Sequence, residues 1–93
     1  MKSAYMYILE CSDDSFYVGS TIDLSLRIIE HNSGIGANYT KKRIPVKLIY
    51  NEEFDSIEEA FLREKQVQKW SRKKKIALIK GEFDRLKELS RGK

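Results

Sequence analysis

The 93-residue sequence contains only one cysteine, one proline and one histidine. Cys11 therefore has no partner for an internal disulfide or for a zinc-binding pair, which favours a reducing, cytoplasmic setting. No apolar run approaches the ~20 residues that span a bilayer, and the first residues lack the pattern of a signal peptide. We therefore expect a soluble cytoplasmic protein that makes no contact with a membrane.

The length allows one domain with a modest core, because small domains bury a limited share of their surface. We expect this domain over residues 1–93, with its core at about 4–80 and a C-terminal helix at about 82–90. Charged residues make up 34% of the chain, and the net charge is +4 with an isoelectric point near 9.2. A basic balance permits a polyanionic partner such as nucleic acid but does not demand one.

Three runs rich in aromatic and β-branched residues predict strands, at 5–10, 16–22 and 46–54. The turn formers at 12–15 predict a hairpin between the first two. Gly19 lies inside the second run and indicates a bulge or the close approach of a phosphate or another element; simple packing under a helix is the alternative. The expected fold is α+β, a small three-stranded antiparallel sheet flanked by helices.

A first helix is expected to begin after Asp23, whose carboxylate can cap it, and to end near residues 32–34. Arg27 and His31 are four residues apart, so they lie on one face of this helix. The apolar side is expected on another face, from Leu24, Leu26, Ile28 and Ile29.

Ser56 and Glu59 form a capping box that begins a second helix, from residue 57 to about residue 70. Glu64 lies in its predicted apolar stripe, where a carboxylate is costly unless it is paired or binds a metal. A salt bridge to a cation such as Arg27, or a position at the rim, is the alternative to a metal ligand. The full predicted stripe is Ile57, Ala60, Phe61, Glu64, Val67 and Gln68.

The hairpin and the first helix carry signatures that resemble those of the GIY-YIG nuclease family. The first stands as Tyr-Met-Tyr at 5–7, the second as Tyr-Val-Gly at 17–19, and the downstream D-L-x-x-R-x-x-x-H pattern at 23–31. Their order and spacing, followed by the helical Glu64, make the resemblance specific. It covers roughly residues 4–80 and is most similar to the small stand-alone GIY-YIG proteins of bacteria.

The resemblance implies a catalytic set. Tyr7 and Tyr17 would lie near the attacking water, Arg27 on the phosphate, His31 beside them, and Glu64 on a divalent metal. Each residue also has an ordinary structural explanation as a strand tyrosine, a surface arginine or a histidine at a helix end. A free phenol titrates near 10, so a tyrosine base needs positive charge nearby, and which tyrosine is the base stays open.

A single carboxylate suits Mg²⁺ or Mn²⁺, held weakly until phosphate oxygens of a nucleic acid complete the coordination. Tyr17, Arg27 and Glu64 are expected to converge on one concave surface. Tyr5 stands where the first signature usually has glycine, a departure that leaves Tyr7 in place.

Substrate contact is expected from cations and aromatic residues around these signatures, since cations bind phosphates and aromatic rings stack on bases. Charge runs are also common on plain solvated surfaces. Trp70 interrupts the second basic run and can either stack or pack into the core. The expected contact residues are Gly19, Tyr39, Lys41, Lys42, Arg43, Lys69, Arg72, Lys73 and Lys74.

The resemblance implies a metal-dependent endonuclease that hydrolyses DNA, in repair or recombination. Little sequence specificity is expected, because the chain has no separate recognition module. The alternative from another class is an accessory module that binds nucleic acid with little turnover, in which Glu64 would be dispensable. An RNA-processing nuclease is a third interpretation, and a protein partner could supply targeting in each case.

Overall fold

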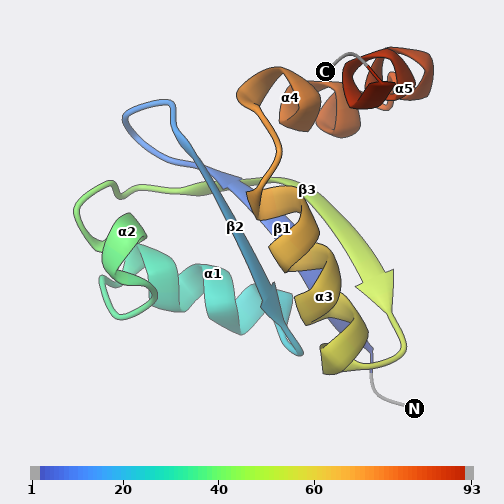
Figure 1. The fold of residues 1–93 in the computed structure, drawn as a ribbon. Helices are drawn as coiled ribbons and strands as arrows, with labels where there is room; N and C mark the ends of the chain where they lie inside the picture. Colours follow the sequence, from blue (N-terminus) through green and yellow to red (C-terminus); the bar gives the residue numbers. More distant parts are fainter. Residues whose placement is uncertain (1–2, 92–93) are drawn as a thin grey trace.

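The computed structural model describes residues 3–91 as a three-stranded antiparallel sheet with helices packed on it (Figure 1). The strands are β1 (Ala4–Glu10), β2 (Phe16–Thr21) and β3 (Lys47–Phe54), in the order β2-β1-β3. The predicted hairpin, the third strand and the α+β class are confirmed. β1 is the central strand, and β2 keeps one edge free of strand partners.

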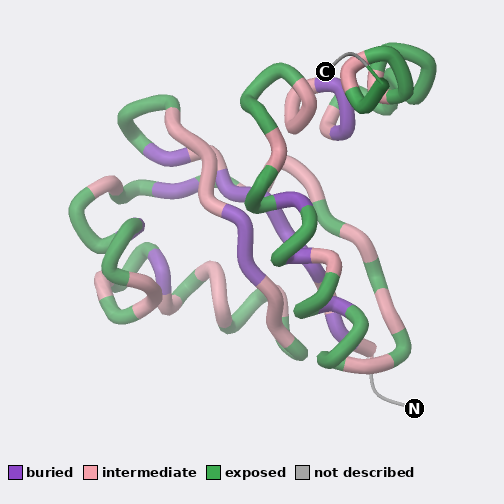
Figure 2. The backbone as a smooth tube through the Cα atoms, in the orientation of Figure 1, coloured by how far each residue is buried: buried purple, intermediate pink, exposed green. Residues whose placement is uncertain are grey.

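The sheet separates two small cores because side chains alternate between its faces. Met6 and Ile8 of β1 pack with Val18, Val67 and Leu78 on the face covered by α3 (Ile57–Gln68). The opposite face, covered by α1 (Leu24–Asn32), holds the second core, formed by Tyr7, Leu9, Cys11 and Val46 with Leu24 and Ile28 packed against it. Figure 2 shows buried residues along the strands and on the inner sides of these helices.

Helix α1 begins as predicted, because the Asp23 carboxylate accepts a hydrogen bond from the Leu26 backbone N–H at 3.1 Å. Its expected apolar side is partly wrong. Leu26 and Ile29 are 51% and 62% exposed, whereas His31 is fully buried. The nine-residue helix meets the sheet along one narrow line, and spacings of four and three continue that line from Leu24 through Ile28 to His31.

A short helix, α2 (Asn38–Lys41), lies in the segment between α1 and β3 where the sequence indicated a loop. Four residues are too few to show helical periodicity, so no sequence pattern could indicate it. Arg43 follows α2 and donates to the Tyr39 backbone carbonyl at 2.8 Å. Helix α2 thereby places Tyr39 and Thr40 beside the C-terminal end of α1 (Figure 1).

Helix α3 is capped as expected by Ser56, whose hydroxyl accepts from the Glu59 backbone N–H at 3.2 Å. The helix ends at Gln68, two residues before the expected end. The predicted buried stripe is confirmed for Ala60, Glu64 and Val67 and wrong for Ile57, Phe61 and Gln68, which are exposed. The cause is again a narrow contact, since only one line of side chains faces the sheet.

The chain continues through α4 (Arg72–Lys80) and α5 (Phe83–Arg91). Ser71 caps α4, Ala77 and Leu78 are its buried residues, and Gly81 ends it with a φ of 72°. Helix α5 packs against α4, stands away from the sheet, and has no buried residue (Figures 1 and 2). Over residues 3–91, no helix is both long and apolar enough to cross a membrane.

Candidate functional site

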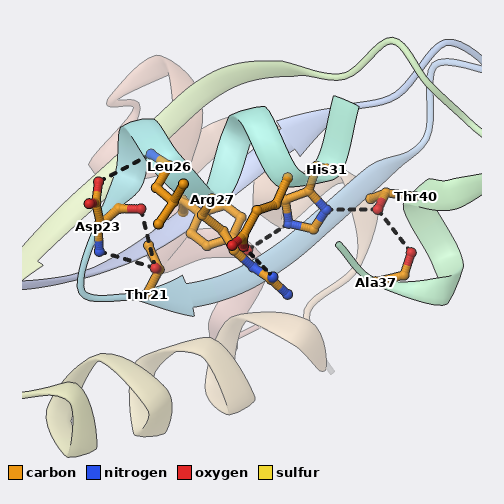
Figure 3. Close-up of polar contacts among 9 residues, drawn as sticks. Thr21, Asp23, Leu26, Arg27, His31, Ala37 and Thr40 are labelled. Carbon is orange, nitrogen blue, oxygen red and sulfur yellow. Dashed lines mark hydrogen bonds and ion pairs between the residues drawn. The ribbon is translucent and has the colours of Figure 1, made fainter. Parts of the chain in front are cut away.

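A buried chain of hydrogen bonds joins β1, α1 and α2. The Tyr7 hydroxyl oxygen lies 2.9 Å from His31 Nε2, and His31 Nδ1 lies 2.7 Å from Thr40 Oγ1. Thr40 in turn donates to the Ala37 backbone carbonyl at 3.1 Å. Figure 3 shows the His31 ring between Arg27 and Thr40, with the dashed contacts running on to Ala37. Tyr7, His31 and Thr40 are all buried.

Two glycines give these side chains room. A Cβ atom on Gly19 would lie 2.5 Å from the Tyr7 hydroxyl oxygen, and one on Gly36 would overlap the His31 ring. The close approach of another element, one of the predicted explanations for Gly19, is therefore found here. The approaching group is the Tyr7 side chain of β1. The bulge, the other explanation, lies elsewhere, between Ile8 and Leu9 in the β1–β3 pair.

Tyr17 extends the cluster toward the free edge of β2. Its ring packs edge-on against His31, with centroids 5.2 Å apart, and lies 6.3 Å from the ring of Tyr7. On its other side Tyr17 stacks with Tyr39, with centroids 6.1 Å apart. Residues of the hairpin, α1 and α2 thus form one continuous aromatic group.

Arg27 stands beside this group at partial exposure. Its Nη1 forms an ion pair with Glu30 Oε1 at 2.9 Å, so Arg27 is not the cation paired with Glu64, whose ion pair is with Lys65 at 4.0 Å. The guanidinium also faces the Tyr7 and Tyr17 hydroxyls, where its charge lowers the pKa of both phenols. Arg27 and His31 share one side of α1, as the spacing predicted (Figure 3).

Burial dominates the protonation of the cluster. It raises the pKa of Tyr7 to about 12, against the opposing effect of Arg27. Burial also raises the pKa of Tyr17, and the negative charge of Glu64 adds to that increase. The pKa of His31 is lowered to about 4, by burial first and by Arg27 second. Both phenols and the imidazole are therefore neutral at pH 7 in the free protein.

Glu64 lies on the other side of β2. Its Oε1 accepts from the Ser20 hydroxyl at 2.6 Å and its Oε2 from Gln68 Nε2 at 2.7 Å. Gln68 also donates to the Val18 carbonyl at 3.1 Å, which ties α3 to the edge strand. Glu64 is 8% exposed, and the Lys65 ammonium lies 4.0 Å from its Oε2. Across residues 3–91, no group of three His, Cys, Asp or Glu side chains is placed to hold a metal ion.

The predicted catalytic residues lie on both faces of the sheet around the edge strand β2, so the expected convergence of Tyr17, Arg27 and Glu64 on one concave surface stays a prediction. In the β1–β2 register Tyr17 and Gly19 share a face with Tyr7, whereas Ser20 shares the opposite face with Met6. Glu64 bonds Ser20 on that opposite face, yet its charge still raises the pKa of both tyrosines. Tyr7, Tyr17, Arg27 and His31 therefore gather on one side of β2, and Glu64 acts on the tyrosines from the other side through its charge.

The predicted contact residues fall into two basic segments that come together beside Tyr17. A hollow of about 220 Å³ at the edge of β2 is lined by Tyr39 of α2 and Lys75 of α4. Its remaining lining residues are Phe16, Tyr17, Val18 and Gln68. Two segments far apart in the sequence, represented by Tyr39 and Lys75, thus border one surface next to the catalytic candidates.

The predicted basic contact residues differ in their exposure and in their contacts with other side chains. Lys41, Lys42, Lys69 and Lys73 are exposed. Arg43 instead forms an ion pair with Asp13 at 2.9 Å and lies over the Tyr39 ring at 4.0 Å. In the second segment Arg72 covers the ring of Phe16 at 4.1 Å and Lys74 covers that of Trp70 at 4.2 Å.

Four contributors were missing from the predicted set: Ser20, Thr40, Gln68 and Lys75. Gln68 is one helical turn after Glu64, and Ser20 follows the second signature directly, so both had a positional signal. Lys75 belongs to the recognised basic run. Thr40 had only the resemblance across residues 36–40, since its partner His31 is nine positions away.

Comparison with known proteins gives matches over most of the chain. The sequence model of a family described as the GIY-YIG catalytic domain matches residues 3–77. A UPF0213 protein of Staphylococcus saprophyticus is 49% identical over 79 residues, which are 85% of this chain and 96% of the relative. Another, from Syntrophus aciditrophicus, is 48% identical over 87 residues, covering 92% of this chain and 100% of the relative.

Two solution structures are also similar. The UPF0213 protein BH0048 from Bacillus halodurans has 46% identity and a TM-score of 0.55, covering 84% of this chain and 83% of that one. A protein from E. faecalis has 44% identity and a TM-score of 0.59, covering 87% and 86%. None of these names states an activity.

Proposed function

The chain belongs to the GIY-YIG nuclease family, and from that premise we propose that it is a metal-dependent DNA endonuclease with little sequence specificity. It hydrolyses phosphodiester bonds in the cytoplasm, in DNA repair or recombination. DNA is favoured over RNA as the substrate. Targeting comes from DNA shape or from a protein partner.

One observation carries the proposal: the Tyr7 hydroxyl bonds His31 and lies within the electrostatic influence of the other predicted catalytic residues. It bonds His31 Nε2 at 2.9 Å, and the charges or phenols of Arg27, Tyr17 and Glu64 all act on its pKa. Such a gathering of titratable groups with perturbed pKa values is typical of catalytic sites. A structural core would have no need to place a guanidinium beside a buried phenol that is already bonded to a histidine.

Divalent metals are the general cofactor of this family, and Glu64 is suited to hold one. Its carboxylate offers about four lone-pair positions, of which Ser20 and Gln68 use two and at the same time fix its orientation. One carboxylate with waters and substrate phosphates is an ordinary Mg²⁺ environment. The bound cation would neutralise charge on the phosphoryl oxygens and on the leaving alkoxide.

The protein's own groups supply the remaining chemistry. Arg27 presents a planar fork of donors that can hold two phosphate oxygens, at the cost of its pairing with Glu30. Tyr7 accepts a proton from the attacking water while His31 Nε2 takes the Tyr7 hydrogen. Tyr17 packs between His31 and Tyr39 and orients the water or the phosphate.

The basic segments supply the binding surface. Lys41 and Lys42 on one side and Lys73 on the other are exposed, and the hollow at Tyr17 lies between their segments. Such cations bind phosphates without reading sequence. Arg43, Arg72 and Lys74 contribute through positions fixed over aromatic rings, and Gly19 keeps the β2 backbone open beside Tyr7.

The proposal is tested by incubating labelled linear, nicked, flapped and branched DNAs, with matched RNAs, in Mg²⁺ or Mn²⁺. The wild-type protein is compared with Arg27→Ala, Glu64→Gln, Tyr7→Phe and Tyr17→Phe, each at protein concentrations that saturate binding. We expect the wild type to cut and the Arg27 and Glu64 variants to lose cutting while still binding DNA. Metal-independent cutting, or cutting that survives Glu64→Gln, would contradict the metal role.

The alternative of a binding module with little turnover also has a specific observation in its favour. Both oxygens of Glu64 already accept hydrogen bonds from Ser20 and Gln68, as a purely structural carboxylate would. In that case no DNA is cut, gel shifts are the same for wild type and Glu64→Gln, and the loss of stability in Glu64→Gln is the main effect.

A further inference from the structure

We propose that Thr40 is a positioning residue that fixes the tautomer of His31 and, through it, the direction of the Tyr7 hydroxyl hydrogen. The inference rests on the proposed function, because it assigns Thr40 a part in the same proton transfer. It concerns a residue outside the signatures, held in the unpredicted helix α2 (Figure 3).

The first step is the hydrogen of Thr40. A threonine hydroxyl has one hydrogen and two lone pairs. Thr40 Oγ1 lies 3.1 Å from the Ala37 carbonyl, which can only accept, so the hydrogen goes there. The same oxygen lies 2.7 Å from His31 Nδ1 and therefore accepts from it. This contact gives His31 the Nδ1–H tautomer, with Nε2 as an unprotonated acceptor.

The second step starts from the other end of the chain of contacts. The Tyr7 hydroxyl is buried and lies 2.9 Å from His31 Nε2. Among residues 3–91 the hydrogen bond of this hydroxyl is to His31; Arg27 also lies beside it, but a guanidinium has no acceptor. The Tyr7 hydrogen is therefore satisfied within the described protein only by pointing at Nε2, which requires the same Nδ1–H tautomer. The contact at Nδ1 and the contact at Nε2 therefore indicate the same tautomer of His31.

The surroundings hold the ring in this state. His31 and Thr40 are fully buried, and the Gly36 backbone lies so close to the imidazole that an added Cβ would be 2.4 Å from Nδ1. The lowered pKa of His31, about 4, keeps the ring neutral in the free protein. In a neutral ring the tautomer decides which nitrogen can accept a proton. The free histidine side chain prefers the Nε2–H tautomer, so the Nδ1–H form has to be held by a partner.

The tautomer of His31 sets the direction of proton transfer in the proposed reaction. A proton leaves water for the Tyr7 oxygen, the Tyr7 hydrogen moves to His31 Nε2, and the water oxygen forms the new bond to phosphorus as the P–O bond to the leaving alkoxide breaks. The proton on Nε2 afterwards returns through Tyr7 to solvent, and the leaving alkoxide takes a proton from solvent, so that His31 and Tyr7 regain their starting states. A phosphate on Arg27 would offset the charge that disfavours a protonated His31. With the opposite tautomer, Nε2–H would donate to Tyr7 and the path would be blocked.

Nitrogen-15 NMR of the imidazole tests the tautomer directly, because His31 is the only histidine in the chain. We expect the wild type and Thr40→Ser to show a protonated Nδ1 and an unprotonated Nε2 at pH 7, and Thr40→Val to show the reverse. A wild type with Nε2–H, or a Thr40→Val protein that keeps Nδ1–H, overturns the proposal. The wild-type spectrum decides the tautomer even if Thr40→Val fails to fold.

Kinetic measurements distinguish a positioning role of Thr40 from a role in packing alone. We expect Thr40→Val to lower kcat by about 100-fold, the lower range for loss of general base catalysis, with an unchanged KM for DNA and an unchanged Mg²⁺ requirement. Thr40→Ser should restore kcat to within a few-fold. A loss confined to KM, or no rescue by serine, overturns the proposal. If no variant and no wild type cuts DNA, the proposed function fails while the NMR result still decides the part played by Thr40.

Discussion

Gly19 faces Tyr7 across the β1–β2 pair so closely that a Cβ atom at position 19 would lie 2.5 Å from the Tyr7 hydroxyl oxygen. The same added atom would lie 3.0 Å from the Tyr17 ring. The glycine of the second signature thus sets the position of both tyrosines, and it does so through space and not through an unusual backbone angle.

Gly19→Ala is therefore expected to displace the Tyr7 ring and break its alignment with His31. Overpacking of this kind costs about 1–3 kcal/mol of stability, and cutting should fall far more than DNA binding. Urea unfolding and single-turnover cleavage measure the two effects. Gly34→Ala is the matched control, since Gly34 has a φ of 81° but open space around its Cβ position; it should lose stability while keeping its activity.

Ser20→Ala is expected to raise the Mg²⁺ concentration needed for half-maximal cutting by about tenfold or more. The Ser20 hydroxyl holds Glu64 Oε1 at 2.6 Å, and loss of a residue that orients a metal ligand typically costs about 10–100-fold in metal affinity. A Mg²⁺ titration of the cleavage rate measures the shift. Ser15→Ala, which removes a hydroxyl bonded to the exposed Asp13, should leave the midpoint unchanged. Equal midpoints in all three proteins would rule out this role for Ser20.

The double variant Lys41→Ala/Lys42→Ala should weaken DNA binding by a similar factor for every sequence. Removing one lysine that binds a phosphate lowers the slope of log affinity against log salt by about 1, so removing the pair should lower it by about 2. Fluorescence anisotropy at several salt concentrations gives the slope. Lys47→Ala, an exposed lysine on β3 at the opposite edge of the sheet, should leave it unchanged. A slope that stays at the wild-type value would remove these two lysines from the interface.

Local signals account for the parts of the fold that the sequence predicted. The turn formers before Phe16, the cap at Asp23 and the cap at Ser56 each act within four residues of their own position, so hairpin and helix starts could be read directly. The buried faces of the helices could not be predicted in this way. Leu26 and Ile29 are apolar yet exposed, and His31 is polar yet buried, because the packing line on α1 depends on where the sheet lies.

The candidate site divides in the same way. Spacing and the family resemblance predicted Tyr7, Arg27 and Glu64 as catalytic residues. In the structure the charges of Arg27 and Glu64 both act on the pKa of Tyr7. The partners that orient them were not predicted, because their contacts join distant positions: Ser20 bonds a residue 44 positions away. Residue type alone could not show that Glu64 and Tyr17 approach β2 from opposite faces, since that follows from strand register.

Acid should destabilise the protein through His31. Its pKa of about 4 in the folded state lies below the ordinary histidine value of 6.5, so below about pH 6.5 the unfolded state binds more protons. Stability is therefore complete above that pH and is lost as the pH falls toward 4. Between pH 7.5 and 5 the loss from this residue is about 2 kcal/mol. Urea unfolding of wild type against His31→Gln isolates it, because the variant should lack this part of the pH dependence. If the free energies of unfolding of both proteins change with pH in the same way, the titrating group is not His31.

Removal of α5 should leave a folded domain that keeps the proposed activity. No residue of α5 is buried, Phe83 is 64% exposed, and only Leu86 packs partly against the core under α3. A chain ending at Gly81 is therefore expected to lose about 1–2 kcal/mol, the value of one partly buried leucine, and to keep cutting DNA.

A chain ending at Trp70 is the contrasting variant, because it also lacks the buried Ala77 and Leu78, of which Leu78 belongs to the core on the face covered by α3. It lacks Lys75 at the hollow beside Tyr17 as well. Loss of a core leucine alone costs about 2–5 kcal/mol, so this chain should unfold in far less urea. The single tryptophan reports on both, since Trp70 lines the groove of about 610 Å³ that Phe83 and Leu86 complete. If the chain ending at Gly81 folds but no longer binds DNA, α5 belongs to the substrate surface and the functional unit extends beyond residue 81.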